Sequence, residues 1–175
     1  MNNYTWTETF RALYDKAVAE YRTGNRAPAR CFTTAQTAAL AAIGHSAQEL
    51  YDFAEDAVNY NEPSFADVLL IAAVRRDYFL VIQKGKPAGR VLRMDDLPAK
   101  DAALAGFAWL PRIIAKARAK LRGEMPAELM YGCGGDRHFL KSVHVHPADF
   151  LRVVWAAGDD DKKIIAYVKH QAAGA

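Results

Sequence analysis

Residues 110–122 read LPRIIAKARAKLR, and residues 10–22 read FRALYDKAVAEYR. The apolar residues of the first segment recur every three or four positions, which places them on one face of a helix. They are Leu110, Ile113, Ile114, Ala117 and Leu121. Pro111 fits the first turn, where its missing N–H costs no hydrogen bond. The two segments therefore predict two amphipathic helices of similar pattern.

The two segments align with each other at a constant offset of 100 residues, so that Lys16, for example, corresponds to Lys116. The same shift brings Ser46, a typical first residue of a helix, onto His146 before a proline. Because several elements agree in one order, the sequence predicts an internal duplication of a four-helix unit. The alternative is coincidence, since alanine-rich amphipathic helices resemble one another.

Composition agrees with an all-α fold. Of the 175 residues 51% are hydrophobic, which is enough to form a buried core, and abundant alanine favours helix over sheet. We expect an N-terminal helical half, residues 1–95, and a C-terminal helical half, residues 96–175. Each half alone is too small to bury its apolar face, so we expect one shared core with pseudo-twofold packing.

Short motifs mark the expected helix starts. In a capping box the hydroxyl of the first residue accepts a hydrogen bond from the backbone N–H three residues later. The side chain of that later residue accepts a hydrogen bond from the backbone N–H of the first residue. Such motifs begin at Thr5, Thr33 and Ser46, while Ser64 and Asp159 are expected to cap two further helices. The helix after Ser64 contains VLLIAAV, which is apolar on all sides, so we expect it to be the most buried element.

Residues 78–94 allow two interpretations. The apolar runs YFLVIQ and RVLRM flank a loop rich in glycine and lysine, which fits a β-hairpin. The same residues fit the end of the preceding helix followed by irregular chain. The second interpretation is favoured because neither run alternates between apolar and polar residues.

Charge and cysteine content restrict the cellular setting. The net charge of +3 does not require a nucleic acid or a membrane as partner. Cys31 and Cys133 are too few for a disulfide framework, which favours a reducing compartment. The apolar run from Val68 to Val74 is far shorter than the ~20 residues that a membrane helix needs. We expect a soluble cytoplasmic protein without a membrane partner, and a homodimer fits these observations.

The C-terminal half resembles a bacterial family described as domain of unknown function 5069. The residues that carry the resemblance are GFAWLPRIIAKARAKLRG at 106–123, Cys133, Asp136, Phe139, and PADFL at 147–151. The resemblance covers roughly residues 104–170. The family tends to have Cys-Pro-Leu-Asp where this chain has Cys-Gly-Gly-Asp. The resemblance implies a small soluble bacterial protein and implies nothing about catalysis.

The loop Gly132–His138 holds the densest chemistry of the chain. With the helix before it, it supplies the candidate ligand-binding residues Cys133, Asp136, Arg137, His138, Arg112 and Lys116. Glycine N–H groups and basic side chains at a helix start can hold an anion. Cys133 near Arg137 and His138 fits a reactive thiol. The simplest interpretation is a glycine turn in which Asp136 caps a helix that starts at Arg137.

Metal binding is a weaker hypothesis for the same region. His144 and His146 join Cys133, Asp136 and His138 as ligand types, but no C-x-x-C or H-E-x-x-H pair is present. His146 precedes a proline and fits a helix cap. We therefore expect no metal and no cofactor.

Arg112, Lys116 and Lys120 follow an i, i+4, i+8 line on the helix of residues 111–122. Such a line can bind the phosphates of a nucleic acid, although we do not favour this. It can also be a solvated face, or the basic residues of this helix can pair with the acidic cluster at 159–161.

The sequence thus predicts a non-catalytic binding or interaction module. The alternative is a small-anion or phosphate binder, or an enzyme, that uses the Gly132–His138 loop and the basic face of helix 111–122. Whether the chain is an enzyme stays open at this point.

Overall fold

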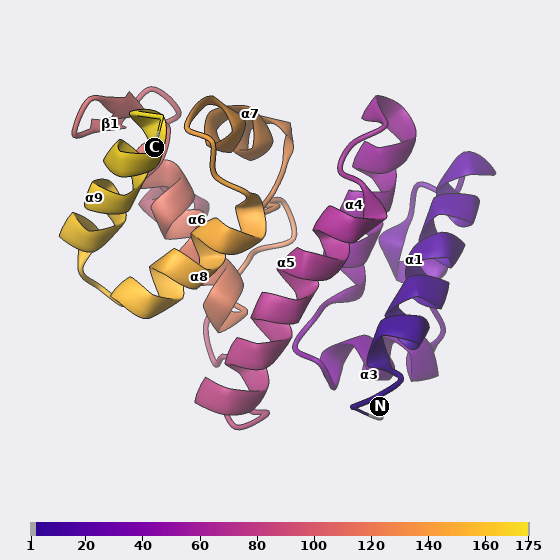
Figure 1. Ribbon diagram of the computed structural model, residues 1–175. Coiled ribbons are helices and arrows are strands. Elements are labelled where there is room, and N and C mark those ends of the chain that lie inside the picture. Colours follow the sequence, from indigo (N-terminus) through magenta and orange to yellow (C-terminus); the bar gives the residue numbers. More distant parts are fainter. Residues whose placement is uncertain (1–2, 175) are drawn as a thin grey trace. The chain divides into compact units, whose positions relative to one another are not determined.

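The structure is a computed structural model that describes residues 3–174, and it confirms the all-α fold. The chain divides into two compact units, Met1–Pro87 and Ala88–Ala175 (Figure 1). The division follows residue 87, whereas the sequence analysis placed it after residue 95. Each unit is described below by itself.

The N-terminal unit is built around the packing of α1 against α4. Its elements are α1 (Trp6–Arg22), α2 (Pro28–Cys31), α3 (Thr34–Ala41), α4 (Ala47–Tyr60), α5 (Phe65–Asp77) and the π-helix η1 (Tyr78–Ile82). The apolar stripe of α1 forms the core, where Phe10 and Ala17 are fully buried. Tyr21 ends this stripe, and its hydroxyl donates to Glu55 Oε1 at 2.9 Å.

The predicted helix caps are confirmed at Thr33, Ser46 and Ser64, each of which forms a capping box. The capping box predicted at Thr5 is wrong, because the Thr5 side chain accepts no cap hydrogen bond. The backbone of Thr5 has φ −114° and ψ 5°, outside the extended region in which a cap side chain reaches the first turn.

α5 is not the most buried element, contrary to expectation. Leu70 is 43% exposed on α5, whereas α6 (Leu110–Arg122) of the other unit has no exposed residue. An all-apolar helix is fully buried only when neighbours cover every side. One side of α5 therefore presents apolar side chains to solvent.

The favoured interpretation of residues 78–94 is confirmed. The helix continues as η1 to Ile82 and is followed by irregular chain up to the 3₁₀ turn η2 (Met94–Asp96). A two-residue hairpin, β1 (Ala103–Leu104) with β2 (Phe107–Ala108), was not anticipated. Its turn residues Ala105 and Gly106 have positive φ angles of 55° and 91°, as tight hairpin turns require.

The C-terminal unit packs α6 against α8 and α8 against α9. Its helices are α6, α7 (Gly134–Ser142), α8 (Pro147–Ala157) and α9 (Asp161–Ala172). The predicted cap at His146 is confirmed, since its Nδ1 accepts from Ala148 N at 3.1 Å. The cap of α9 is Asp160 and not Asp159 as predicted, because Asp159 turns toward Arg122.

Candidate functional site

A buried ion pair joins α6 to the first turn of α7. Lys116 Nζ donates to Asp136 Oδ2 at 2.5 Å and to Cys133 Sγ at 3.2 Å. The side chains of Lys116 and Asp136 are only 2% and 0% exposed. We call Trp109, Lys116, Gly132, Cys133 and Asp136 the lysine–aspartate cluster.

Both oxygens of Asp136 are occupied inside this cluster. Trp109 Nε1 donates to Oδ1 at 2.9 Å, and the Gly132 N–H donates to Oδ2 at 2.9 Å. The prediction that Asp136 caps a helix starting at Arg137 is wrong. The helix begins three residues earlier with Cys133 as its N-cap, and the carboxylate turns inward to the lysine.

Trp109 and Gly135 fit together as one packing unit. Trp109 adopts the left-handed conformation, with φ 71°, directly before α6. A Cβ atom added to Gly135 would lie 2.6 Å from Trp109 Cζ2, so the indole occupies the space that any larger residue would need. Trp109 was not among the site residues predicted from the sequence. Its place in the family motif was the only available signal.

Tyr131 lies beside the cluster and is fully buried. Its hydroxyl donates to Pro147 O at 2.8 Å. Burial raises the pKa of Tyr131 well above its ordinary value, and the charge of Asp136 raises it further. The hydroxyl therefore stays protonated and acts as a structural donor.

The remaining predicted residues surround the cluster without entering it. Arg112 donates to Pro98 O at 2.6 Å, and its guanidinium lies 5.9 Å from the centroid of the Trp109 ring. Arg137 Nη1 donates to Gly132 O at 2.7 Å and so braces the loop. His138 is exposed, and across residues 3–174 no hydrogen bond joins it to Cys133. The structure thus brings Cys133 together with Lys116, not with a histidine base.

The line of Arg112, Lys116 and Lys120, for which phosphate binding was the interpretation not favoured, is largely buried on α6. Lys116 and Lys120 are 2% and 1% exposed, so neither can reach a phosphate backbone. Lys116 directly precedes Ala117, and Lys120 directly precedes Leu121, and both of these apolar residues belong to the buried stripe. The aliphatic part of each lysine side chain is therefore buried with that stripe.

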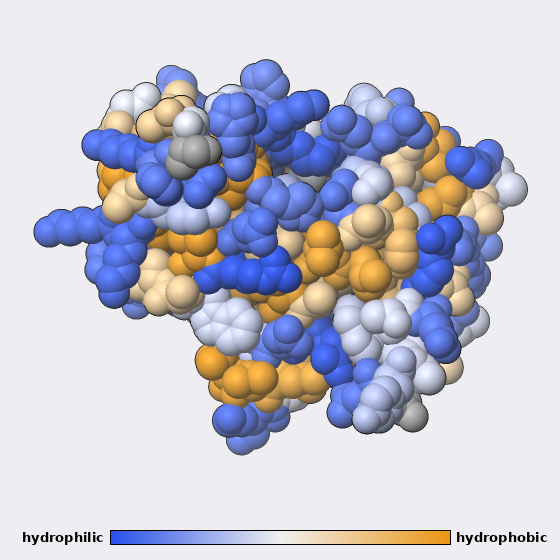
Figure 2. Space-filling model, in the orientation of Figure 1, coloured by the Kyte–Doolittle hydropathy of each residue, from blue (hydrophilic) through white to orange (hydrophobic). Residues whose placement is uncertain are grey.

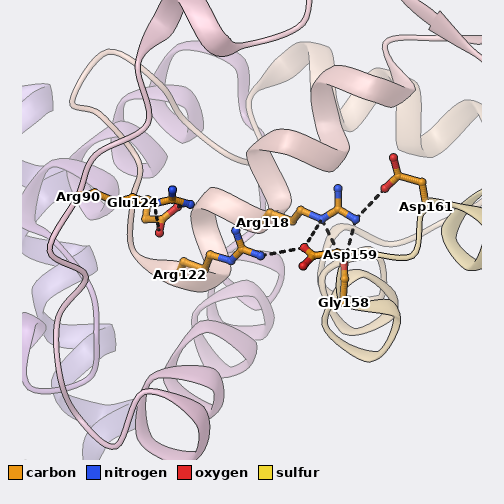
Figure 3. A network of polar contacts seen from close by, with 7 residues as sticks. All are labelled: Arg90, Arg118, Arg122, Glu124, Gly158, Asp159 and Asp161. Atoms are coloured by element: carbon orange, nitrogen blue, oxygen red, sulfur yellow. Dashed lines mark hydrogen bonds and ion pairs between the residues drawn. The ribbon is translucent and has the colours of Figure 1, made fainter.

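The pairing predicted between this helix and the acidic cluster at 159–161 is confirmed for two arginines (Figure 3). Arg118 Nη2 lies 2.7 Å from Asp161 Oδ1, and Arg122 Nη2 lies 3.1 Å from Asp159 Oδ1. Arg118 also donates to Gly158 O at 2.9 Å. In Figure 3 both side chains point toward the turn between α8 and α9, so the basic surface of α6 holds this turn.

Residues 3–174 contain neither of two further classes of site. No three histidine, cysteine, aspartate or glutamate side chains come together there in a way that could hold a metal ion. None of the helices in that range is both long and apolar enough to cross a membrane.

The C-terminal unit is thus a helical domain whose most polar interior feature is a lysine–aspartate pair. Residues 96–175 match the model of a family described as a domain of unknown function (DUF5069), which confirms the resemblance found in the sequence. The match includes the whole lysine–aspartate cluster. No curated protein and no solved structure matches the chain significantly.

Proposed function

We propose that the protein is a non-catalytic interaction module. The observation that carries this proposal is that the lysine–aspartate cluster is satisfied from within. A general acid or base must reach its substrate, but Asp136 is fully buried with both oxygens accepting hydrogen bonds. The alternative of an anion site on the Gly132–His138 loop needs a cation there. Lys116 is already held by Asp136, and Arg137 donates to Gly132 O.

The surface that supports an interaction role is the end of the α5–η1 helix. Leu80, Val81 and Ile82 are consecutive apolar residues of η1, and they are 37%, 54% and 49% exposed. Figure 2 shows hydrophobic surface over the lower end of this helix. Contiguous exposed apolar side chains mark contact sites more often than scattered ones do. We call these three residues the η1 patch.

A second copy of this chain is the partner that fits the η1 patch. Asp77, whose side chain is 57% exposed, precedes the patch, and the exposed Lys84 and Lys86 follow it. In a twofold interface each surface meets itself in the opposite direction. Asp77 of one copy would then face the lysines of its partner at both ends. The proposed assembly is therefore a homodimer.

Size-exclusion chromatography with light scattering tests the homodimer over a series of concentrations. We expect a dimer for the natural chain and a monomer for Val81→Asp, because a buried carboxylate without a partner opposes association. Tyr60→Ser is the matched control, since Tyr60 is 69% exposed in the same unit but outside the patch. A natural chain that stays monomeric throughout, or a Val81→Asp variant that still dimerises, would overturn the proposal.

We also propose a location in the bacterial cytoplasm. Cys31 and Cys133 are free thiols, which supports a reducing compartment, and the family resemblance supports a bacterial source. Fractionation of the source cells tests the location, and recovery of the protein outside the cytoplasmic fraction would contradict it.

A further inference from the structure

The N-terminal unit contains a pocket that belongs to neither feature described so far. It lies between α1, the end of α4 and the turn that leads into α5, and its volume is about 460 Å³. Small-molecule sites usually measure about 300–1,000 Å³. The pocket is thus large enough for a small organic ligand.

Tyr14 supplies an unused hydrogen-bonding group in the wall of this pocket. Its side chain is only 6% exposed and its ring packs on Phe65 with 5.1 Å between the centroids. Within residues 3–174 its hydroxyl has no hydrogen-bond partner. The oxygen is open to solvent at the pocket, so a ligand that accepts from it can gain this contact.

Arg11 lies at the same pocket and is paired with Asp15, with 54% of its side chain exposed. Its Nε donates to both oxygens of Asp15, at 2.9 and 2.8 Å, and its guanidinium lies 4.4 Å from the centroid of the Phe65 ring. The two terminal nitrogens of Arg11 have no partner in the described part of the chain. They are therefore available to donate to an acceptor in the pocket.

Arg22 brings a second positive charge to the pocket. It forms no ion pair or hydrogen bond with any other described residue, although it lines the same wall. Burial raises the pKa of Tyr14, while the charges of Arg11 and Arg22 oppose that shift, so both guanidinium groups lie near its hydroxyl. Two arginines and Asp15 leave a net charge of +1, which suits an anion of single charge.

The remaining lining is mixed: Asn61 and Ser64 are polar, and four residues are apolar. Val18, Ala57, Val58 and Pro63 line it and offer no hydrogen bond from their side chains. We infer that the pocket binds a small organic carboxylate, with its oxygens on Tyr14, Arg11 and Arg22 and its apolar body against these four residues. The pocket contains no residue of the η1 patch, so this inference does not depend on the homodimer.

Benzoate is the probe for this inference, and its binding is detected in ¹H–¹⁵N correlation spectra of the natural chain. We expect saturable shifts of the amides of α1 and of residues 57–65, with affinity in roughly the millimolar range for so small a ligand. Benzamide has the same shape without the charge, and it should cause no saturable shift. Inorganic phosphate should bind more weakly than benzoate, because it cannot use the apolar wall.

Two variants identify the contacts. Arg22→Gln should weaken benzoate binding by about tenfold, because a charge-assisted hydrogen bond is lost. Tyr14→Phe keeps the aromatic ring but removes the hydroxyl, and it should weaken benzoate binding by about fivefold. Arg30→Gln is the matched control, since Arg30 is exposed in the same unit and does not line the pocket.

The inference would be overturned by the absence of saturable shifts with benzoate, or by an equal response to benzamide. Unchanged binding in folded Arg22→Gln would also overturn it. Tighter binding of phosphate than of benzoate would replace the carboxylate assignment by an inorganic anion site.

Discussion

At the scale of single residues, Lys116 and Asp136 are stable inside the protein only as a pair. Removing an ammonium and a carboxylate from water costs free energy, and their mutual contact and added hydrogen bonds offset that cost. Here the carboxylate gains the indole N–H and the Gly132 N–H as well as the lysine. Loss of one partner leaves the other charge buried alone.

We therefore predict that Lys116→Met lowers the free energy of unfolding by about 3 kcal/mol, measured by urea denaturation. Lys16→Met is the matched control, because Lys16 Nζ donates to the neutral Gln36 Oε1 at 3.0 Å in a partly buried position. Its loss should cost no more than about 1 kcal/mol. Equal losses in the two variants would show that the charge of Asp136 does not matter.

The two glycines at the start of α7 should respond in opposite directions to alanine. Gly135→Ala forces the indole of Trp109 aside and should destabilise the protein by about 1–3 kcal/mol. Gly134→Ala has no atom nearer than 3.9 Å to its new Cβ and should stabilise α7 by up to about 1 kcal/mol. Thermal unfolding of both variants checks this. A Gly135→Ala variant as stable as Gly134→Ala would contradict the packing of Trp109.

At the scale of the element, α4 carries a group of acids whose most buried member titrates unusually. The pKa of Asp52 is raised to about 6, first by burial and then by the nearby Glu55, Glu49 and Asp56, while a hydrogen bond from Gln48 opposes the shift. The folded state thus holds a proton that the unfolded state releases at lower pH. Between pH 4 and 6 this group makes the protein less stable as the pH rises.

Asp52→Asn should remove that penalty. At pH 8 we predict that the variant is more stable than the natural chain by about 1 kcal/mol, a value reduced from the full shift because Asp52 is partly solvated. The difference should shrink as the pH falls toward 4. Urea denaturation at a series of pH values measures it, with Asp95→Asn as the control on a side chain that is 87% exposed. A difference independent of pH would contradict the assigned titration.

The elements were predictable where local chemistry decides them. The capping boxes at Thr33, Ser46 and Ser64 involve residues three apart, so the sequence contains both partners. The hairpin at 103–108 was not predicted, because strands of two residues are too short to show an alternation of apolar and polar residues. The burial of Lys116 was not predicted, because helical periodicity shows only that it lies in line with Arg112 and Lys120. Its partner Asp136 belongs to α7, which is distant in the sequence. The sequence therefore left open whether the line of basic residues on this helix is a solvated face or is paired with acidic residues.

At the scale of the whole molecule, we propose that the two units descend from one duplicated sequence. The shift of 100 residues relates the starts of α3 and α7, at 34 and 134, and of α4 and α8, at 47 and 147. It also relates the Lys16–Gln36 hydrogen bond to the Lys116–Asp136 pair. Superposition of experimental coordinates of the two units tests this. If each pair of corresponding helices needed a different offset in residue number to superpose, the proposed duplication would be contradicted.

The packing of Trp109 on Gly135 has a consequence for the order in which mutations can accumulate. The proposed duplication would match these positions with Thr9 and Ala35 of the N-terminal unit, where no indole needs the space of a side chain. An ancestor with tryptophan could accept alanine beside it only after the indole had been lost. In the opposite direction, an ancestor with alanine would need glycine at this position before it could accept tryptophan. Under the proposed duplication, the two substitutions could therefore be accepted in only one order in each direction.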